Sequence, residues 1–279
     1  MKKSNSKYTI ADKIYSNAIC AIEMGLEDYQ KSIGDSKRLH SAVRNFYAGL
    51  MLLLKSKLAS LSSDDNNSLI KCKLIPHLEG NIVVWEGKED RTVDARQIEE
   101  RFKSLNILID WKIIAKLQNY RNNIEHYFDT KNVTAQTVGE YISDCFKIIC
   151  DFMQTYLQKY PQQEFSYKTM EIFTSIQKTR ESNIVKRDIA FDDLIWDSEE
   201  EKDLYMSFCC TECGCDILLP ETKSNEKSAS KIKFFCSNCH KKYSYKDIML
   251  ESEIQLANNL IIESDDDIIT FPDVAYELR

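Results

Sequence analysis

The chain is poor in glycine and proline, with 7 Gly and 4 Pro among 279 residues. This scarcity excludes collagen-like chains, disordered linkers and turn-rich all-β folds, and it favours long helices. No apolar run approaches the roughly 18 residues that a membrane-spanning helix needs. No apolar stretch follows the basic N-terminus, so we expect no secretory signal and a cytoplasmic location.

Charge is distributed unevenly along the chain, whose formal net charge is −7. Residues 1–160 carry 23 Lys+Arg and 20 Asp+Glu, a net of +3, whereas residues 161–279 carry 14 and 24, a net of −10. The negative average excludes a protein that binds polyanions over its whole surface, but it allows a local basic site in the first half. At roughly 100–200 residues per domain, the length predicts two domains.

Apolar residues recur every three to four positions over most of residues 8–160, and this spacing predicts a mainly α fold, an antiparallel helical bundle. The stripe Leu39, Val43, Phe46 and Leu50 is one example. We expect helices at 9–33, 36–61, 95–105, 111–128 and 134–160, with Asp94 and Thr134 capping the third and the last. Two β-prone runs within residues 81–93 predict a small hairpin inserted between helices.

The rest of the chain divides by composition. Eight acidic residues and one Lys fall between residues 188 and 203, which is typical of an exposed linker. We therefore expect a connecting helix and acidic linker at 161–203, a zinc ribbon at 204–250, and a helix end with an acidic and apolar tail at 251–279.

Six of the ten cysteines fall between residues 209 and 239. Clustered thiols without a secretory signal indicate a metal site rather than a disulfide framework. Cys210 and Cys213 form one Cys-x-x-Cys pair, and Cys236 and Cys239 form a second, separated from the first by 22 residues. Two such turns supply the four tetrahedral thiolates of structural Zn²⁺.

Several alternatives to this ligand set stay open. His240 can replace a cysteine, Cys209 or Cys215 can shift the register, and an iron–sulfur cluster uses the same ligand type. Four thiolates leave no open position on a zinc ion, so we expect no catalysis at this site.

A second candidate site lies on a helix expected at 111–128. His126 and Asn122 fall opposite the apolar stripe of that helix, and Arg121 falls at the edge of the stripe. A lone His on a polar face is usually only solvated, and Arg121 can pair with Glu125 one turn later. Spacing alone therefore does not establish a site.

The segment Arg-Asn-Asn-Ile-Glu-His at 121–126 resembles the Arg-x4–6-His signature of HEPN-domain ribonucleases, including the polar residue after the Arg. Residues 41–50 also resemble the early helix of bacterial HEPN proteins. The resemblance covers roughly residues 8–160 and not the ribbon. One departure is that Tyr127 directly follows His126, one place earlier than in HEPN proteins paired with nucleotidyltransferase antitoxins.

The resemblance implies a homodimeric, metal-independent endoribonuclease that acts as an intracellular toxin or anti-phage effector. Two copies of the motif would face each other, with His126 transferring protons, Arg121 stabilising the phosphate and Asn122 orienting either group. RNA is then the substrate, no membrane is involved, and a protein inhibitor or activator stays open. Lysines with interleaved aromatics suggest RNA contacts on the ribbon, namely Lys231, Lys233, Lys241 and Lys242.

Two other functions remain in competition. One is a non-catalytic HEPN and zinc-ribbon module that binds nucleic acid or a protein partner. The other is a zinc-ribbon adaptor in a transcription or repair complex. The acidic tail also raises the hypothesis of autoinhibition, because it resembles RNA in charge density.

Overall fold

The computed structural model describes residues 9–32, 35, 37–62, 68–126, 134–221 and 226–254. The chain divides into two compact units, residues 1–180 and residues 181–279. It is mainly helical with small antiparallel sheets, in agreement with the predicted fold class at that level. None of the helices in the described part is long and apolar enough to cross a membrane.

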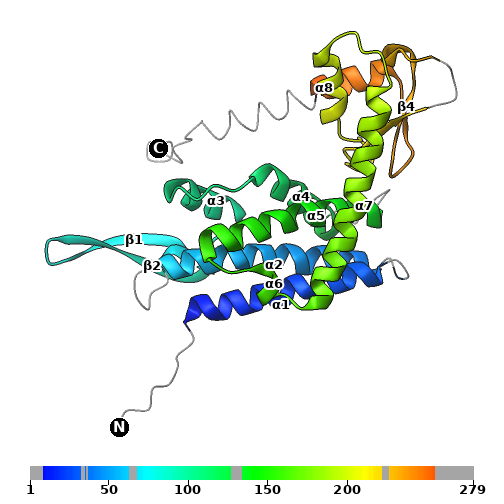
Figure 1. The fold of residues 1–279 in the computed structure, drawn as a ribbon. Helices are drawn as coiled ribbons and strands as arrows, with labels where there is room; N and C mark the ends of the chain where they lie inside the picture. The colour runs from blue at the N-terminus through cyan, green and yellow to red at the C-terminus, as the bar shows by residue number, and fades with distance from the viewer. Residues whose placement is uncertain are drawn as a thin grey trace, which may run out of the picture. The chain divides into compact units, whose positions relative to one another are not determined.

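The first unit is built from helices that surround one hydrophobic core, with a two-stranded sheet at one end (Figure 1). Helix α1 begins at a capping box in which Thr9 and Asp12 exchange hydrogen bonds, and α3 begins at an equivalent box formed by Asp94 and Gln97. Thr134 caps α5, as the sequence predicts. The helices are α1 (Ile10–Lys31), α2 (Lys37–Leu61), α3 (Ala95–Ser104), α4 (Trp111–His126), α5 (Ala135–Phe152), α6 (Pro161–Glu164) and α7 (Tyr167–Asp192).

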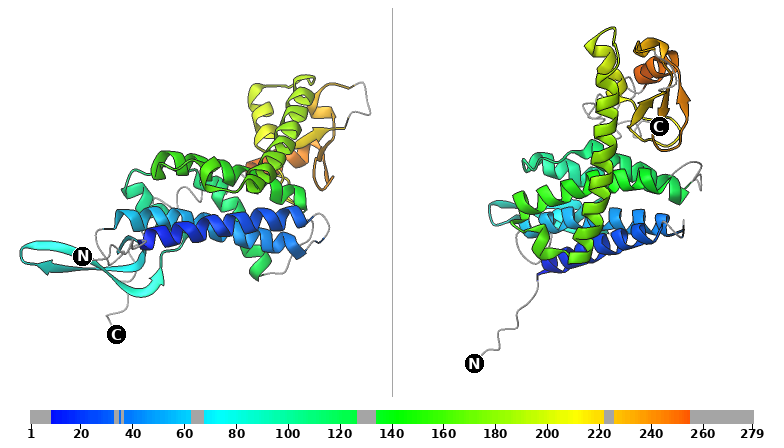
Figure 2. Two further views of the ribbon diagram at one scale, coloured as in Figure 1. Left: turned by 60° about the horizontal axis from the view of Figure 1, so that its bottom comes forward. Right: turned by 45° about the vertical axis from the view of Figure 1, so that its right-hand side comes forward.

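Helices α1 and α2 lie side by side along their length, as Figures 1 and 2 show from different directions. Two glycines on facing surfaces permit this close approach. A Cβ atom on Gly25 would lie 2.7 Å from the backbone nitrogen of Phe46, and one on Gly49 would lie 2.7 Å from that of Ile22. The close pairing therefore explains why both helices tolerate glycine despite its cost in a helix interior.

A hairpin is present, but the prediction of its strands and turn is wrong, because both β-prone runs and Gly87 between them lie along one strand and the turn comes earlier, at Gly80. Strand β1 (Lys71–Glu79) follows the short 3₁₀ helix η1 (Ser68–Ile70) and pairs in antiparallel fashion with β2 (Ile82–Thr92). Gly80 adopts a left-handed conformation at the turn, with φ of 65°. The hairpin projects away from the helices, as Figures 1 and 2 show from different directions.

Helix α5 ends earlier than the predicted limit at Tyr160. It gives way to a π-helical turn, η2 (Met153–Leu157), and the chain then reverses at Gln158, whose φ of 55° is left-handed. A left-handed residue terminates a helix because the next amide can then bond to an exposed carbonyl. The amide of Lys159 accordingly donates to the carbonyl of Met153 at 3.0 Å.

The second unit contains the C-terminal end of α7, α8 (Glu199–Ser207), a three-stranded sheet and a helix over residues 245–254. The sheet has the order β3-β4-β5 with antiparallel pairing throughout. Its strands are β3 (Leu218–Pro220), β4 (Phe234–Cys236) and β5 (Lys242–Tyr243), and a 3₁₀ turn, η3 (Ala229–Lys231), precedes β4.

The prediction of an exposed acidic linker up to residue 203 is wrong. Helix α7 continues to Asp192, and Ser198 caps α8 through its hydroxyl. Phe191 is completely buried and Trp196 packs edge-on against Tyr205. Most acidic residues of this segment are exposed, but Glu201 is buried and accepts a hydrogen bond from the Asp197 amide at 2.6 Å, while Phe191 and Tyr205 enter the core of the second unit. A charge count does not detect this arrangement.

Candidate metal centre and Arg–His helix

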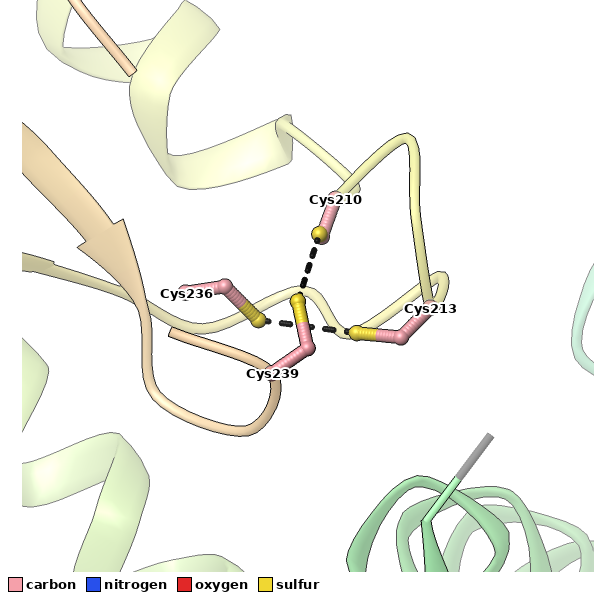
Figure 3. Close-up of side chains that lie close together, drawn as sticks. All are labelled: Cys210, Cys213, Cys236 and Cys239. Carbon is pink, nitrogen blue, oxygen red and sulfur yellow. Dashed lines mark hydrogen bonds between the residues drawn. The ribbon is translucent and has the colours of Figure 1, made fainter. Parts of the chain in front are cut away.

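The four predicted zinc ligands come together in the second unit. Cys210, Cys213, Cys236 and Cys239 point their sulfur atoms at one another (Figure 3), and all four sulfurs lie within 4.8 Å of each other. The Cys210–Cys239 and Cys213–Cys236 sulfur pairs are both 3.5 Å apart. These separations are far longer than the roughly 2.05 Å of a disulfide bond.

The geometry fits a four-coordinate metal ion. A tetrahedral zinc ion with Zn–S bonds of about 2.3 Å separates its sulfurs by about 3.8 Å, and the observed cluster brackets that value. Three of the cysteines are buried and the fourth is half-buried. The four cysteines can therefore bind a metal ion without a further ligand from solvent.

The two Cys-x-x-Cys turns share one backbone construction. Gly214 follows the first pair with φ of 73°, and His240 follows the second with φ of 59°. The amide of Gly214 donates to the carbonyl of Cys210 at 2.8 Å, and the amide of His240 donates to that of Cys236 at 3.1 Å. Glycine suits this left-handed position, and His240 occupies it in the second turn at a conformational cost.

The other candidate ligands in this region lie outside the cluster of four. The His240 side chain is exposed, and its ring lies 6.2 Å from that of Phe235. Cys215 is buried and its sulfur lies 3.4 Å from the hydroxyl of Ser237. Cys209 makes a weak contact with the carbonyl of Ser207. The fold therefore does not place Cys209, Cys215 or His240 among the four clustered ligands.

Electrostatics within the cluster favour a cation. Hydrogen bonds with Cys213 and Cys236 lower the pKa of the Cys210 thiol, whereas hydrogen bonds with Cys210 and Cys236 raise the pKa of the Cys213 thiol. One thiolate is thus easily formed, but its neighbours resist ionisation beside it. A divalent metal ion removes this conflict because it stabilises all four thiolates together.

Sequence reasoning missed a group of polar contacts around Cys210. The Tyr243 hydroxyl lies 3.0 Å from the Cys210 sulfur and accepts a hydrogen bond from the Thr211 amide at 3.0 Å. Lys241 donates to the Thr211 hydroxyl at 2.9 Å and to Glu212 at 2.6 Å. The Thr211 hydroxyl also lies 3.1 Å from the Tyr243 oxygen, and when it donates to that oxygen as the Thr211 amide does, the phenolic proton points to the sulfur. No motif signals this role, since β5 alone places Tyr243 there.

The predicted RNA-contact surface of the second unit is only partly present. Phe234 and Tyr243, expected among its aromatics, are buried and cannot stack on bases. Lys241 pairs with Glu212, and Lys242 pairs with Glu221 at 2.8 Å. The remaining predicted lysines, Lys231 and Lys233, are exposed, and Lys231 lies 3.9 Å from Glu226.

The Arg–His segment forms the last turns of α4 in the first unit. The buried residues Ile114, Leu117, Tyr120 and Ile124 turn toward the core, so the apolar stripe lies close to its predicted position. Arg121, at the edge of this stripe, and Asn122, on the opposite side of the helix, are both half-buried. His126 is the final residue of the helix, and its side chain lies outside the described part, as do Tyr127, Phe128 and residues 255–279 of the tail.

Two neighbours hold the guanidinium of Arg121. It donates to the side-chain oxygen of Asn122 at 2.9 Å, and its central carbon lies 5.7 Å from the centre of the Tyr47 ring on α2. Burial raises the pKa of Tyr47 to about 12, so the phenol stays neutral beside the cation. The structure thus brings the two segments with HEPN resemblance, residues 41–50 and 121–126, into contact through Tyr47 and Arg121.

Comparisons with family models, with curated proteins and with solved structures find no match to this chain.

Proposed function

We propose that this chain is a homodimeric endoribonuclease of HEPN type whose second unit is a structural zinc ribbon. The observation that carries the proposal is the Arg-x4-His segment at the end of α4, with Arg121 held at the edge of the core by Asn122 and Tyr47. A guanidinium fixed in this way can bind a phosphate without first losing its side-chain freedom.

The chemistry follows from the residue types. RNA cleavage through the ribose 2′-hydroxyl requires a base for that hydroxyl and an acid for the leaving 5′-oxygen. His126 has an ordinary pKa of about 6.5 and serves either role near neutrality. One chain places one such residue on α4, and a two-fold dimer supplies the second. Arg121 then stabilises the charge that develops on the phosphate in the transition state.

The zinc ribbon serves the fold of the second unit in this proposal. Cys210, Cys213, Cys236 and Cys239 would hold Zn²⁺, which supplies cross-linking and leaves no position open for substrate. The support is the spacing of the two turns together with the sulfur geometry. A second candidate function, a module that only binds nucleic acid or a protein, retains the same fold without cleavage.

Replacement of the histidine separates the two functions. The His126→Ala protein should lose RNA cleavage by at least about 100-fold, the lower end of what general acid–base catalysis contributes. Cleavage of a labelled RNA pool under single-turnover conditions measures the loss, and circular dichroism reports the fold. The matched control is His77→Ala, which removes an exposed histidine that the proposal does not use. Equal cleavage by a folded His126→Ala protein refutes the assignment.

A further inference from the structure

In the part of the chain that the structure describes, the two-stranded hairpin, residues 71–92, is attached to the first unit at its base, and we call it the arm. Arg101 on α3 donates to the carbonyl of Lys71 at 2.7 Å and also bonds to that of Leu69. Ile70 and Val93 flank the arm and are buried in the core of the first unit. Within the described part, no residue of the arm itself belongs to that core. The base of the arm is therefore fixed to the first unit, whereas the arm itself contributes little to the hydrophobic core of that unit.

The pairing register sorts the arm side chains onto two faces. Leu78 pairs with Val83 and Pro76 pairs with Trp85, so these residues lie on one face together with Leu74. We call these five residues the apolar arm face. The opposite face carries His77, Glu79, Glu86 and the Lys73–Lys88 pair alongside Ile75, Val84 and Ile82.

The apolar arm face is exposed along its outer half. The exposed fractions are 70% for Leu78, 57% for Val83 and 56% for Trp85. At about 3.4 Å per residue, the stretch from Leu74 to Glu79 carries these side chains on the order of 17 Å from the base. A two-stranded hairpin is marginally stable in water unless a further strand or surface covers its apolar side. An uncharged exposed face of this kind marks a contact with another surface.

The charge of the arm limits which kind of partner can cover the apolar arm face. The arm sequence contains four Lys or Arg and four Asp or Glu, so its net charge is zero, and the apolar arm face itself has no charged residue. RNA or an anionic lipid surface would be met by an excess of basic residues. The complementary surface for an uncharged face is another uncharged face, and every second copy of the chain carries one.

We propose that the apolar arm face packs against the same face of a second copy, related by a two-fold axis. Such a contact is self-complementary because the outer Leu78 and Val83 of one arm meet the inner Leu74 and Trp85 of the other. Five side chains per copy are fewer than the roughly 20–30 residues of a standard stable interface. The arm contact therefore adds to the homodimer rather than forming it alone, and it does not depend on RNA cleavage.

Neighbouring residues on opposite faces provide the test. Val83→Ser and Trp85→Ser alter the apolar arm face, whereas Ile82→Ser removes an apolar side chain, itself 70% exposed, from the other face. Sedimentation equilibrium of the full chain without RNA measures the dimer dissociation constant. We expect Trp85→Ser to raise it by at least about tenfold, the loss typical of a buried aromatic anchor, and Val83→Ser to raise it less. Ile82→Ser should leave it within about twofold.

Each outcome decides between specific alternatives. A wild-type dimer that all three variants leave unchanged overturns the arm contact while the two-fold catalytic site stands. A monomeric wild type at every concentration overturns both proposals. Weaker RNA binding by Trp85→Ser at an unchanged dissociation constant assigns the arm to RNA and also overturns the contact. Weaker dimerisation with retained RNA cleavage per dimer supports the arm contact independently of the catalytic assignment.

Discussion

At the level of single residues, the metal cluster shows how much of a site lies beyond its ligands. The four cysteines are recognisable from spacing, because two Cys-x-x-Cys turns have few other uses. Tyr243 is not recognisable, since its contact with Cys210 depends on the pairing of β5 with β4. A hydroxyl that donates to a thiolate withdraws charge from it and fixes its orientation. We infer that Tyr243 strengthens metal binding through Cys210.

This inference yields a residue-level prediction. The wild-type protein should contain one zinc ion per chain by elemental analysis, and Tyr243→Phe should bind it at least about tenfold more weakly, as is typical when an outer partner of a ligand is lost. Competition with a chromophoric chelator measures the affinity. Tyr245→Phe removes a nearby hydroxyl and leaves the Cys210–Tyr243 hydrogen bond intact, so it serves as the control. Equal affinities for all three proteins would show that Tyr243 has only a packing role.

At the level of elements, the sequence predicted most helices within a few residues because their apolar spacing and caps are local signals. Thr134 caps α5 and Asp94 caps α3 as predicted. The failures involve contacts distant in sequence. Both predicted β runs lie along β2, whose partner strand β1 precedes them in the chain. The folded acidic segment is stabilised by Phe191 and Tyr205, which meet Phe234 from elsewhere in the chain.

The α1–α2 pair offers a test of packing at this level. Gly49→Ala should lower the free energy of unfolding by about 1–3 kcal/mol because the new methyl group would overlap the backbone of Ile22. Helix propensity alone predicts the opposite sign, a gain of about 1 kcal/mol. Chemical denaturation followed by circular dichroism measures the change. Ala48→Gly, at an exposed neighbouring position, should lose about 0.5–1 kcal/mol through propensity. A Gly49→Ala protein more stable than wild type would contradict the close helix contact.

At the level of the whole molecule, a helical unit carries Arg121 and a second unit carries the cysteine cluster. The sequence located both candidate sites but not the packing around them. Tyr47 lies 74 positions before Arg121 in the chain, so only the fold reveals that it supports the guanidinium. The side chain of His126 completes the proposed site, and its role rests on residue chemistry and on the HEPN resemblance.

The chemistry of the RNA ends tests the central claim most directly. Wild-type protein should cleave RNA in the presence of EDTA, with its bound zinc verified after the reaction. Attack by the 2′-hydroxyl predicts products with 2′,3′-cyclic phosphate or 3′-phosphate ends and 5′-hydroxyl ends, which mass spectrometry identifies. A DNA oligonucleotide of the same sequence should remain intact because it lacks that hydroxyl. Products with 3′-hydroxyl and 5′-phosphate ends, or no cleavage of RNA by the zinc-loaded dimer, would contradict the account.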